Sequence, residues 1–290
     1  MSTDTAAAES AELVRPPYAA SKFIFVWSIH LVSLLAAVAW VRGDLVVSLK
    51  TLAFAALWFA LSSTAITAGY HRLFAHPTYS AGWPLKVLYL LTGAAAFQGS
   101  VLQWSAQHRD HHTFTDTARD PYNIKMGFWF AHMGWVVRET YPDYGRVVDL
   151  QKDPLVRLQH RFFNRIAFAT SFGVPFLVGS LWQESVATLL VAGFIRLTIQ
   201  WHMTFCVNSV AHYFGSQKFS TNHTATGNWW LAFITWGEMD HNYHHTYPED
   251  FRTGTRWFDF DPGKWWIALC SAIGLAHDLK RARTERVARR

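Results

Sequence analysis

Three short segments of the chain concentrate histidine at spacings that suit metal binding. They contain eight of the 15 histidines and read His71-Arg72-Leu73-Phe74-Ala75-His76, His108-Arg109-Asp110-His111-His112 and His241-Asn242-Tyr243-His244-His245. In the second and third segments the histidines stand at positions i, i+3 and i+4, which share one face of a helix. We therefore expect the three imidazoles of each segment to converge on one point, as in other helical histidine motifs that bind metal.

A single His-x-x-His-His could also be a solvated or interface cluster. Three such segments favour metal, because packed imidazoles repel one another once protonated and lose hydration when buried. Eight histidines exceed the number that one ion takes, so we expect two ions. Imidazoles suit iron, zinc, copper or nickel, and spacing alone does not choose among them. With only Cys206 and Cys270 in the chain, a cysteine-built zinc site and a disulfide framework are excluded.

The elements that must position these histidines are apolar and long. Hydrophobic residues make up 51% of the chain and charged residues only 16%. Because about 20 apolar residues cross a bilayer, we predict four spanning helices in two hairpins, at about 23–41, 50–69, 166–182 and 186–206. A softer apolar stretch at about 87–104 predicts a helix at the membrane interface.

These elements predict an all-α integral membrane protein whose cytosolic helical cap carries a histidine-ligated di-metal site. We expect a single domain at 21–279 between a mobile N-terminal tail, 1–20, and a basic C-terminal tail, 280–290. Residues 1–20 have no apolar stretch near their start, which is not typical of a cleaved signal peptide.

The basic residues indicate which side of the membrane the histidines occupy. Of the 26 lysines and arginines, only Arg42 and Lys50 lie near the two short loops, and Arg196 lies inside a predicted span. The others fall in segments that share a side with both termini and the three histidine segments. Since lysine and arginine are enriched in cytosolic loops, we predict cytosolic termini and a cytosolic metal site. The net charge of +6 is explained by this topology, without a nucleic-acid partner.

The histidine segments and their flanks resemble the membrane fatty acyl desaturases, in particular the Δ9 stearoyl-CoA type. The resemblance runs from about Leu61 to the end of the chain. The stretches that carry it are Thr67-Ala68-Gly69-Tyr70-His71-Arg72-Leu73, the His108 segment with Asp120-Pro121-Tyr122-Asn123, Val207-Asn208-Ser209-Val210-Ala211-His212, and Gly237-Glu238-Met239-Asp240-His241-Asn242-Tyr243-His244-His245-Thr246-Tyr247-Pro248.

The resemblance implies an O2-dependent enzyme that introduces a cis double bond into a long-chain acyl substrate, at Δ9 of an acyl-CoA. It implies two non-haem iron ions as cofactor. The implied ligands are His71, His76, His108, His111, His112, His212, His241, His244 and His245, with Asn208 reaching one iron through water. For His212 the assignment depends on the resemblance, because an isolated histidine would otherwise be read as structural.

The resemblance also implies a kinked internal tunnel for the acyl chain. Gln98, Trp104 and Thr204 would line the kink, Phe59 and Ser63 would set the room for the methyl end, and Lys125 would lie near the CoA moiety. Read from the residues alone, Gln98 and Thr204 lie in apolar segments and need hydrogen-bond partners, which they could provide for each other.

Some positions depart from the family pattern, so the sequence does not determine which group carries the acyl chain. Gly99, Ala106 and Gln107 stand where polar CoA contacts occur in the animal enzymes, and Lys125-Met126 replaces an Arg-Arg pair. An acyl chain on a lipid or on a carrier protein is therefore an alternative to acyl-CoA. We expect electrons from a separate protein of the ferredoxin, rubredoxin or cytochrome b5 type, because the chain has no room for a fused donor domain.

Two other functions stay open. A hydroxylase, acetylenase or conjugase could use the same scaffold. A non-catalytic membrane protein that binds or transports metal should place ionisable residues near mid-membrane, and Arg196 and His202 are the hints in its favour. The remaining histidines have no cluster partner in the sequence and are expected to be packed or solvent-facing: His30, His132, His160, His202, His223 and His277.

Overall fold

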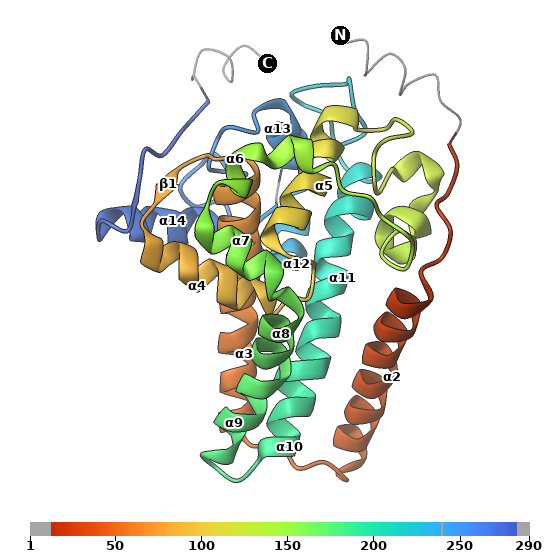
Figure 1. Ribbon diagram of the computed structural model, residues 1–290, viewed down its shortest axis with the longest axis vertical. Coiled ribbons are helices and arrows are strands. Elements are labelled where there is room, and N and C mark those ends of the chain that lie inside the picture. The colour runs from red at the N-terminus through yellow and green to blue at the C-terminus, as the bar shows by residue number, and fades with distance from the viewer. Residues whose placement is uncertain (1–12, 239, 283–290) are drawn as a thin grey trace.

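The structure is a computed structural model that describes residues 13–238 and 240–282, and it is mostly helical. Figure 1 shows long helices side by side in the lower part of the view, with shorter helices over their upper ends. Both ends of the described chain lie on that upper side. Residues 1–12 of the predicted N-terminal tail and 283–290 of the predicted basic tail lie outside the described residues.

Three helices are long and apolar enough to cross a membrane, and they contain three of the predicted spans. The first is α2 (Ala20–Arg42), and the second joins α3 (Leu49–Thr64) to the π-helix η1 (Ala65–Ala75). The third, Ser185–His212, joins α10 (Ser185–Thr188), η6 (Leu189–Ile195), α11 (Arg196–Ser209) and η7 (Val210–His212). The second and third run past the predicted ends at 69 and 206, so they carry His71 and His212 within the same continuous helices.

The predicted span at 166–182 falls in a bent pair of helices. Helix α7 (Pro154–Arg161) meets at 77° an arm built from α8 (Phe163–Phe168), η5 (Ala169–Gly173) and α9 (Val174–Ser180). The break lies at Phe162, whose φ of −110° and ψ of 17° are not helical. Length and composition give a fourth crossing only if this pair is one broken span.

The stretch predicted as one interfacial helix at about 87–104 is two helices, α4 (Trp83–Ala94) and α5 (Val101–Phe114). Between them Phe97 and Gly99 have φ of 50° and 89°, and residues in this left-handed region commonly end helices. The Ser100 side chain then accepts a hydrogen bond from the backbone N–H of Gln103 and caps α5. The His108 segment therefore lies on a separate helix with its own direction.

The remaining elements are shorter than the three long helices. They are β1 (Ser80–Ala81), η2 (Ile124–Met126), η3 (Phe130–Gly134), η4 (Tyr144–Val147), α6 (Val148–Gln151), α12 (Leu231–Thr235), α13 (His241–Thr246), α14 (Pro262–Ala272) and β2 (Ala276–His277). The two short strands pair antiparallel, with Ser80 opposite His277.

Helices η1 and α4 pack through a reciprocal pair of glycine and tyrosine contacts. A Cβ added at Gly69 would meet the Tyr89 ring at 2.6 Å, and one added at Gly93 would meet the Tyr70 ring at 2.5 Å. Both tyrosines are almost completely buried, at 1% and 0% exposed. The two helices can approach this closely because glycine has no side chain. The contact holds η1, which carries His71, against α4.

We expect Gly69→Ala to destabilise the protein by about 1–3 kcal/mol, because the new methyl group has no space beside Tyr89. Gly173→Ala is the matched control, since a Cβ there meets nothing within 4 Å. Thermal unfolding in detergent measures both. Equal midpoints for the two variants would contradict this account of the packing.

Candidate metal centre

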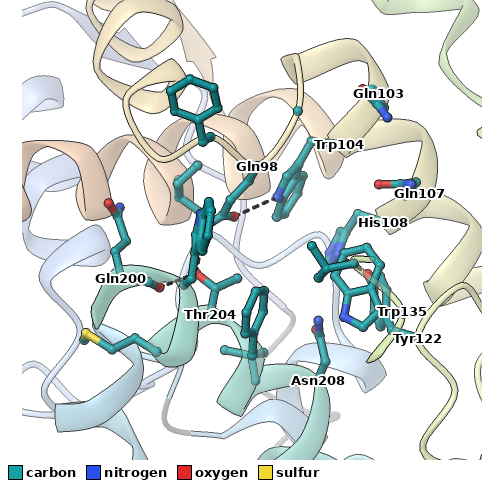
Figure 2. Close-up of a pocket in the computed structure, with 18 of the residues that line it drawn as sticks. Gln98, Gln103, Trp104, Gln107, His108, Tyr122, Trp135, Gln200, Thr204 and Asn208 are labelled. Carbon is teal, nitrogen blue, oxygen red and sulfur yellow. Dashed lines mark hydrogen bonds between the residues drawn. The ribbon is translucent and has the colours of Figure 1, made fainter. Parts of the chain in front are cut away.

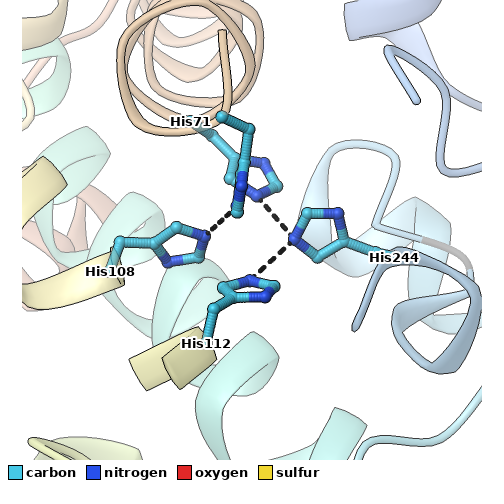
Figure 3. Close-up of side chains that lie close together, drawn as sticks. His71, His108, His112 and His244 are labelled. Atoms are coloured by element: carbon cyan, nitrogen blue, oxygen red, sulfur yellow. Dashed lines mark hydrogen bonds between the residues drawn. The ribbon is translucent and has the colours of Figure 1, made fainter. Parts of the chain in front are cut away.

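Nine histidines form two adjacent groups in which the ring nitrogens face one another. The first group is His71, His76, His108, His112 and His244, and the second is His111, His212, His241 and His245. Within each group the possible ligand atoms lie within 4.8 Å of one another, so each group could hold a metal ion. Figure 3 shows part of the first group. The groups touch where the rings of His112 and His245 stack with centroids 4.2 Å apart.

The expectation that each segment converges on one point is wrong. On α5, His108 and His112 belong to the first group and His111 to the second. The division follows from helix geometry, because neighbouring residues point about 100° apart. The histidines at positions i and i+4 belong to the same group, and the histidine at position i+3 belongs to the other group. The same division separates His244 from His241 and His245 on α13.

The π-helix η1 explains how His71 and His76 reach the same group. Five residues separate them, which would place them on different faces of an α-helix. The backbone N–H of His76 instead donates to the carbonyl of His71, the i to i+5 bond of a π-helix. Their ring centroids are consequently 5.0 Å apart.

In some of these rings, Nδ1 faces away from the group and makes a hydrogen bond. This bond determines which nitrogen carries the proton and leaves Nε2 facing the group. His111 Nδ1 donates to Asp120 Oδ1 at 2.9 Å, so its Nε2 carries a lone pair toward the group. Thr224 Oγ1 donates to Asp116 Oδ1 and accepts from His212 Nδ1 at 2.8 Å, which leaves the His212 Nε2 lone pair facing inward.

In the second group, the Nε2 atoms of neighbouring rings lie 3.1–3.2 Å apart, so lone pairs turned inward from several rings could bind one ion between them. In addition, the Nδ1 atom of His241 is buried and has no hydrogen-bond partner among the residues that the structure describes. The donor set therefore fits a metal ion, and carboxylate–histidine pairs of this kind orient ligands in metal sites.

Glu238 contacts both a histidine of the first group and the buried Arg72. Its carboxylate lies 3.4 Å from His71 Nδ1 and 3.4 Å from the Arg72 guanidinium. Arg72 is 1% exposed and also pairs with Asp261, the residue that caps α14. Burial alone would raise the pKa of Glu238, but His71 and Arg72 hold it below its ordinary value. An ionised Glu238 orients His71.

A cavity of about 580 Å³ reaches both groups. Three of the nine histidines, His71, His108 and His241, line it, together with Gln98, Trp104, Thr204, Asn208 and Ser63. The predicted hydrogen bond is present: Gln98 Nε2 donates to Thr204 Oγ1 at 2.9 Å (Figure 2). Trp104 Nε1 donates to Gln98 Oε1 at 3.2 Å, and its indole stacks on His108.

Two predicted substrate residues lie away from this cavity. Lys125 is exposed on η2, and neither it nor Phe59 is among the described residues that line the cavity. The Phe59 ring instead contacts the indole of Trp236, which does line it.

Three of the six remaining histidines are joined in a chain. His202 Nε2 lies 3.1 Å from His30 Nε2, and His202 Nδ1 lies 3.0 Å from His132 Nε2. Because His202 turns a different nitrogen to each partner, the three do not form a cage around one ion. His223 packs its ring 5.0 Å from His245, a proximity that the sequence did not indicate.

Known proteins were compared with this chain. Residues 48–268 match the family model described as fatty acid desaturase. The chain belongs to this family. It is 41% identical over 243 residues to Acyl-CoA desaturase 1 of Saccharomyces cerevisiae, covering 82% of this chain and 48% of that protein. It is 47% identical over 234 residues to the Probable acyl-CoA desaturase of Schizosaccharomyces pombe, covering 79% and 49%.

An animal member of the desaturase family is also similar. Stearoyl-CoA desaturase 5 of Bos taurus is 37% identical over 240 residues, with 80% of this chain and 72% of that protein covered. The chain spans about half the length of the two yeast relatives. Family membership and the three long apolar helices make this desaturase-family chain an integral membrane protein.

Burial makes the histidine groups of this desaturase-family protein poor bases. Outside the long apolar helices, it lowers the pKa of five histidines well below the ordinary 6.5, and neighbouring histidines add to the effect: His76, His108, His112, His244 and His245. Burial likewise lowers the pKa of His241 to about 3. These rings are neutral at pH 7 and are available to bind metal.

We expect Asp120→Asn to weaken metal binding in the second group by roughly 10–100-fold, because the amide does not hold His111 Nδ1–H as a carboxylate does. Asp278→Asn is the control, since that side chain is 72% exposed. Metal content per chain, measured after dialysis against buffered iron, reports the difference. If both variants retain as much metal as the parent protein, Asp120 has no orienting role.

Metal-free protein should lose stability as the pH falls below about 6.5. Burial lowers the folded-state pKa of five of the group histidines below the 6.5 of the unfolded chain, so the unfolded chain binds more protons in that window: His76, His108, His112, His244 and His245. Each such histidine then removes about 1.4 kcal/mol of stability per pH unit. Thermal unfolding with chelator between pH 7.5 and 5.5 measures the slope. The slope should be shallower in His112→Ala/His245→Ala, and an equal slope would argue against this origin.

Proposed function

We propose that the chain is an O2-dependent fatty acyl desaturase with two iron ions, which acts at Δ9 of a long-chain acyl-CoA. The observation that carries the proposal is the position of the two histidine groups. Both groups border one cavity, whose walls are largely apolar and include Gln98, Trp104 and Thr204. The relative from Saccharomyces cerevisiae is named Acyl-CoA desaturase 1, and the bovine relative is named Stearoyl-CoA desaturase 5.

The residues of the chain would bind and orient the acyl substrate. The Gln98–Thr204 hydrogen bond satisfies two polar groups that would otherwise be unpaired beside an apolar chain. Trp104 places its indole between this pair and His108, so the acyl chain would bend next to the first histidine group. Phe97, Phe168 and Trp201 add apolar walls that exclude water.

The nine histidines would hold the iron, with Asn208 in the cavity wall beside them as a ligand through water. Bound iron would supply the oxidising chemistry that removes one hydrogen from each of two adjacent methylenes. O2, two electrons and two protons would be consumed, and two waters would leave. The electrons would come from a separate protein of the ferredoxin, rubredoxin or cytochrome b5 type.

We further propose four membrane crossings, with the bent pair α7 and α8–α9 supplying the third crossing along the chain. The cap, both termini and the histidine groups would lie in the cytosol. The distribution of basic residues supports this orientation, since Arg42 and Lys50 are the cations near the two short loops.

Expression in a desaturase-deficient host should restore cis-unsaturated fatty acids, measured by mass spectrometry of total lipids. His212→Ala should abolish the products and lower bound iron, because the second group would lose one of its four imidazoles. His277→Ala should do neither, since its side chain is 61% exposed.

An unchanged lipid profile, with iron-loaded protein and reductant shown to be present, would reject the proposal. Hydroxylated or acetylenic products would indicate the related chemistries on the same scaffold. Metal uptake by vesicles without lipid products would indicate a transporter.

A further inference from the structure

The cavity has an open end and a closed end. Its lining residues include two exposed ones, Ser21 at the start of α2 and Asn164 on α8. On the α3 side they include Ser63 and Thr235, each 7% exposed. Figure 1 shows α2 and α3 on opposite sides of α11, so Ser21 of α2 and Ser63 of α3 lie toward opposite ends of the cavity. An acyl chain that enters from the α2 side would reach the α3 side with its methyl end.

Trp236 stands at this closed end. It follows α12 directly and lines the cavity. Its indole Nε1 donates to Thr64 Oγ1 on α3 at 3.0 Å. The ring of Phe59 meets the indole edge-on, with centroids 5.3 Å apart at 87°. The indole is therefore held from behind by α3, and Trp236 contacts the cavity where Phe59 does not.

The backbone of Trp236 is held in an unfavourable conformation. Its φ of 59° and ψ of 37° are left-handed, a region that a bulky side chain rarely occupies. The next residue, Gly237, also has positive φ, and a Cβ there would lie 3.0 Å from Asp261 Cα. Asp261 is fixed by the buried Arg72. Such a conformation persists only where the surroundings enforce it, and it often marks a functional constraint.

We propose that Trp236 is the residue that ends the acyl cavity and sets the longest chain that the site accepts. This inference rests on the proposed function. A chain longer than the cavity leaves methylenes outside apolar surroundings, and each excluded methylene lowers binding roughly four-fold. A wall held by Thr64, Phe59 and a fixed backbone cannot yield to a longer chain as a flexible side chain would.

Trp236→Gly tests the proposal, because glycine removes the indole and is relaxed at positive φ. We expect competition between 16-, 18- and 20-carbon substrates to shift toward chains two carbons longer by roughly 15-fold. The double bond should keep its distance from the carboxyl end, because Gln98 and Thr204 are untouched. Thr64→Val should shift the preference in the same direction but less, since it frees the indole without removing it.

Trp229→Ala is the control, because Trp229 lies in the same segment but is 71% exposed. An unchanged length preference in folded Trp236→Gly, or an equal shift in Trp229→Ala, would overturn the proposal. A second measurement does not require turnover: thermal stabilisation of the full chain by acyl-CoA thioesters of 14 to 20 carbons. If the optimum length shifts there while no variant produces unsaturated lipid, the proposed function fails and the role of Trp236 stands. If lipid products form and neither measurement shows a length shift, only the role of Trp236 fails.

Discussion

Nine imidazoles, six of them buried and three partly exposed, face two small spaces, and the rest of the structure depends on holding them there. Neutral imidazole has one donor and one acceptor, and in the second group at least His111 and His212 have already used their donors outward. The lone pairs that remain face a space in which they could bind a cation. Folding brings these atoms together from four separate parts of the chain, so η1, α5, η7 and α13 have to be held rigidly before any metal binds.

That rigidity comes from buried charge as well as from apolar packing. Arg72 follows His71 in the chain, and its guanidinium pairs with Glu238 and Asp261, which lie in segments far away in sequence. Removing one partner of such a buried network leaves an uncompensated charge, which is strongly destabilising. The network therefore ties the C-terminal segment, with α13 and its three histidines, to the second membrane-spanning helix.

The sequence predicted which histidines gather but not how they divide. The i, i+3, i+4 spacing indicated a shared face, yet the 100° step between neighbours sends His111 and His244 to the other group. His71 and His76 have a spacing that no α-helix explains, and they meet only because η1 is a π-helix, for which the sequence carries no clear signal. The division of α4 from α5 could have been anticipated from Gly99 and Ser100, a glycine and a capping residue next to each other.

Contacts between distant segments were the least predictable from sequence. Asp120 lies in a stretch that resembles the family, so the sequence marked it as a residue associated with the His108 segment. Trp236 had none, because an aromatic residue before Gly237 reads as ordinary core until its positive φ and its contact with Thr64 are known. His30, His132 and His202 are at least 70 residues apart in the sequence, so the sequence gives no sign of contact between them. Their side chains meet because α2 and η3 pack on α11.

Glu238 and Asp261, the two acidic partners of Arg72, fix the geometry of the site. Glu238 holds His71 at the first histidine group, and two residues earlier Trp236 closes the cavity. Both are anchored through Arg72, by way of Glu238 directly and of Asp261 against Gly237. The distance between the metal-facing imidazole and the cavity end is thus fixed by one short rigid segment. In a desaturase such a segment would hold the methyl end and the reacting carbons in register, because neither could move without breaking a buried ion pair.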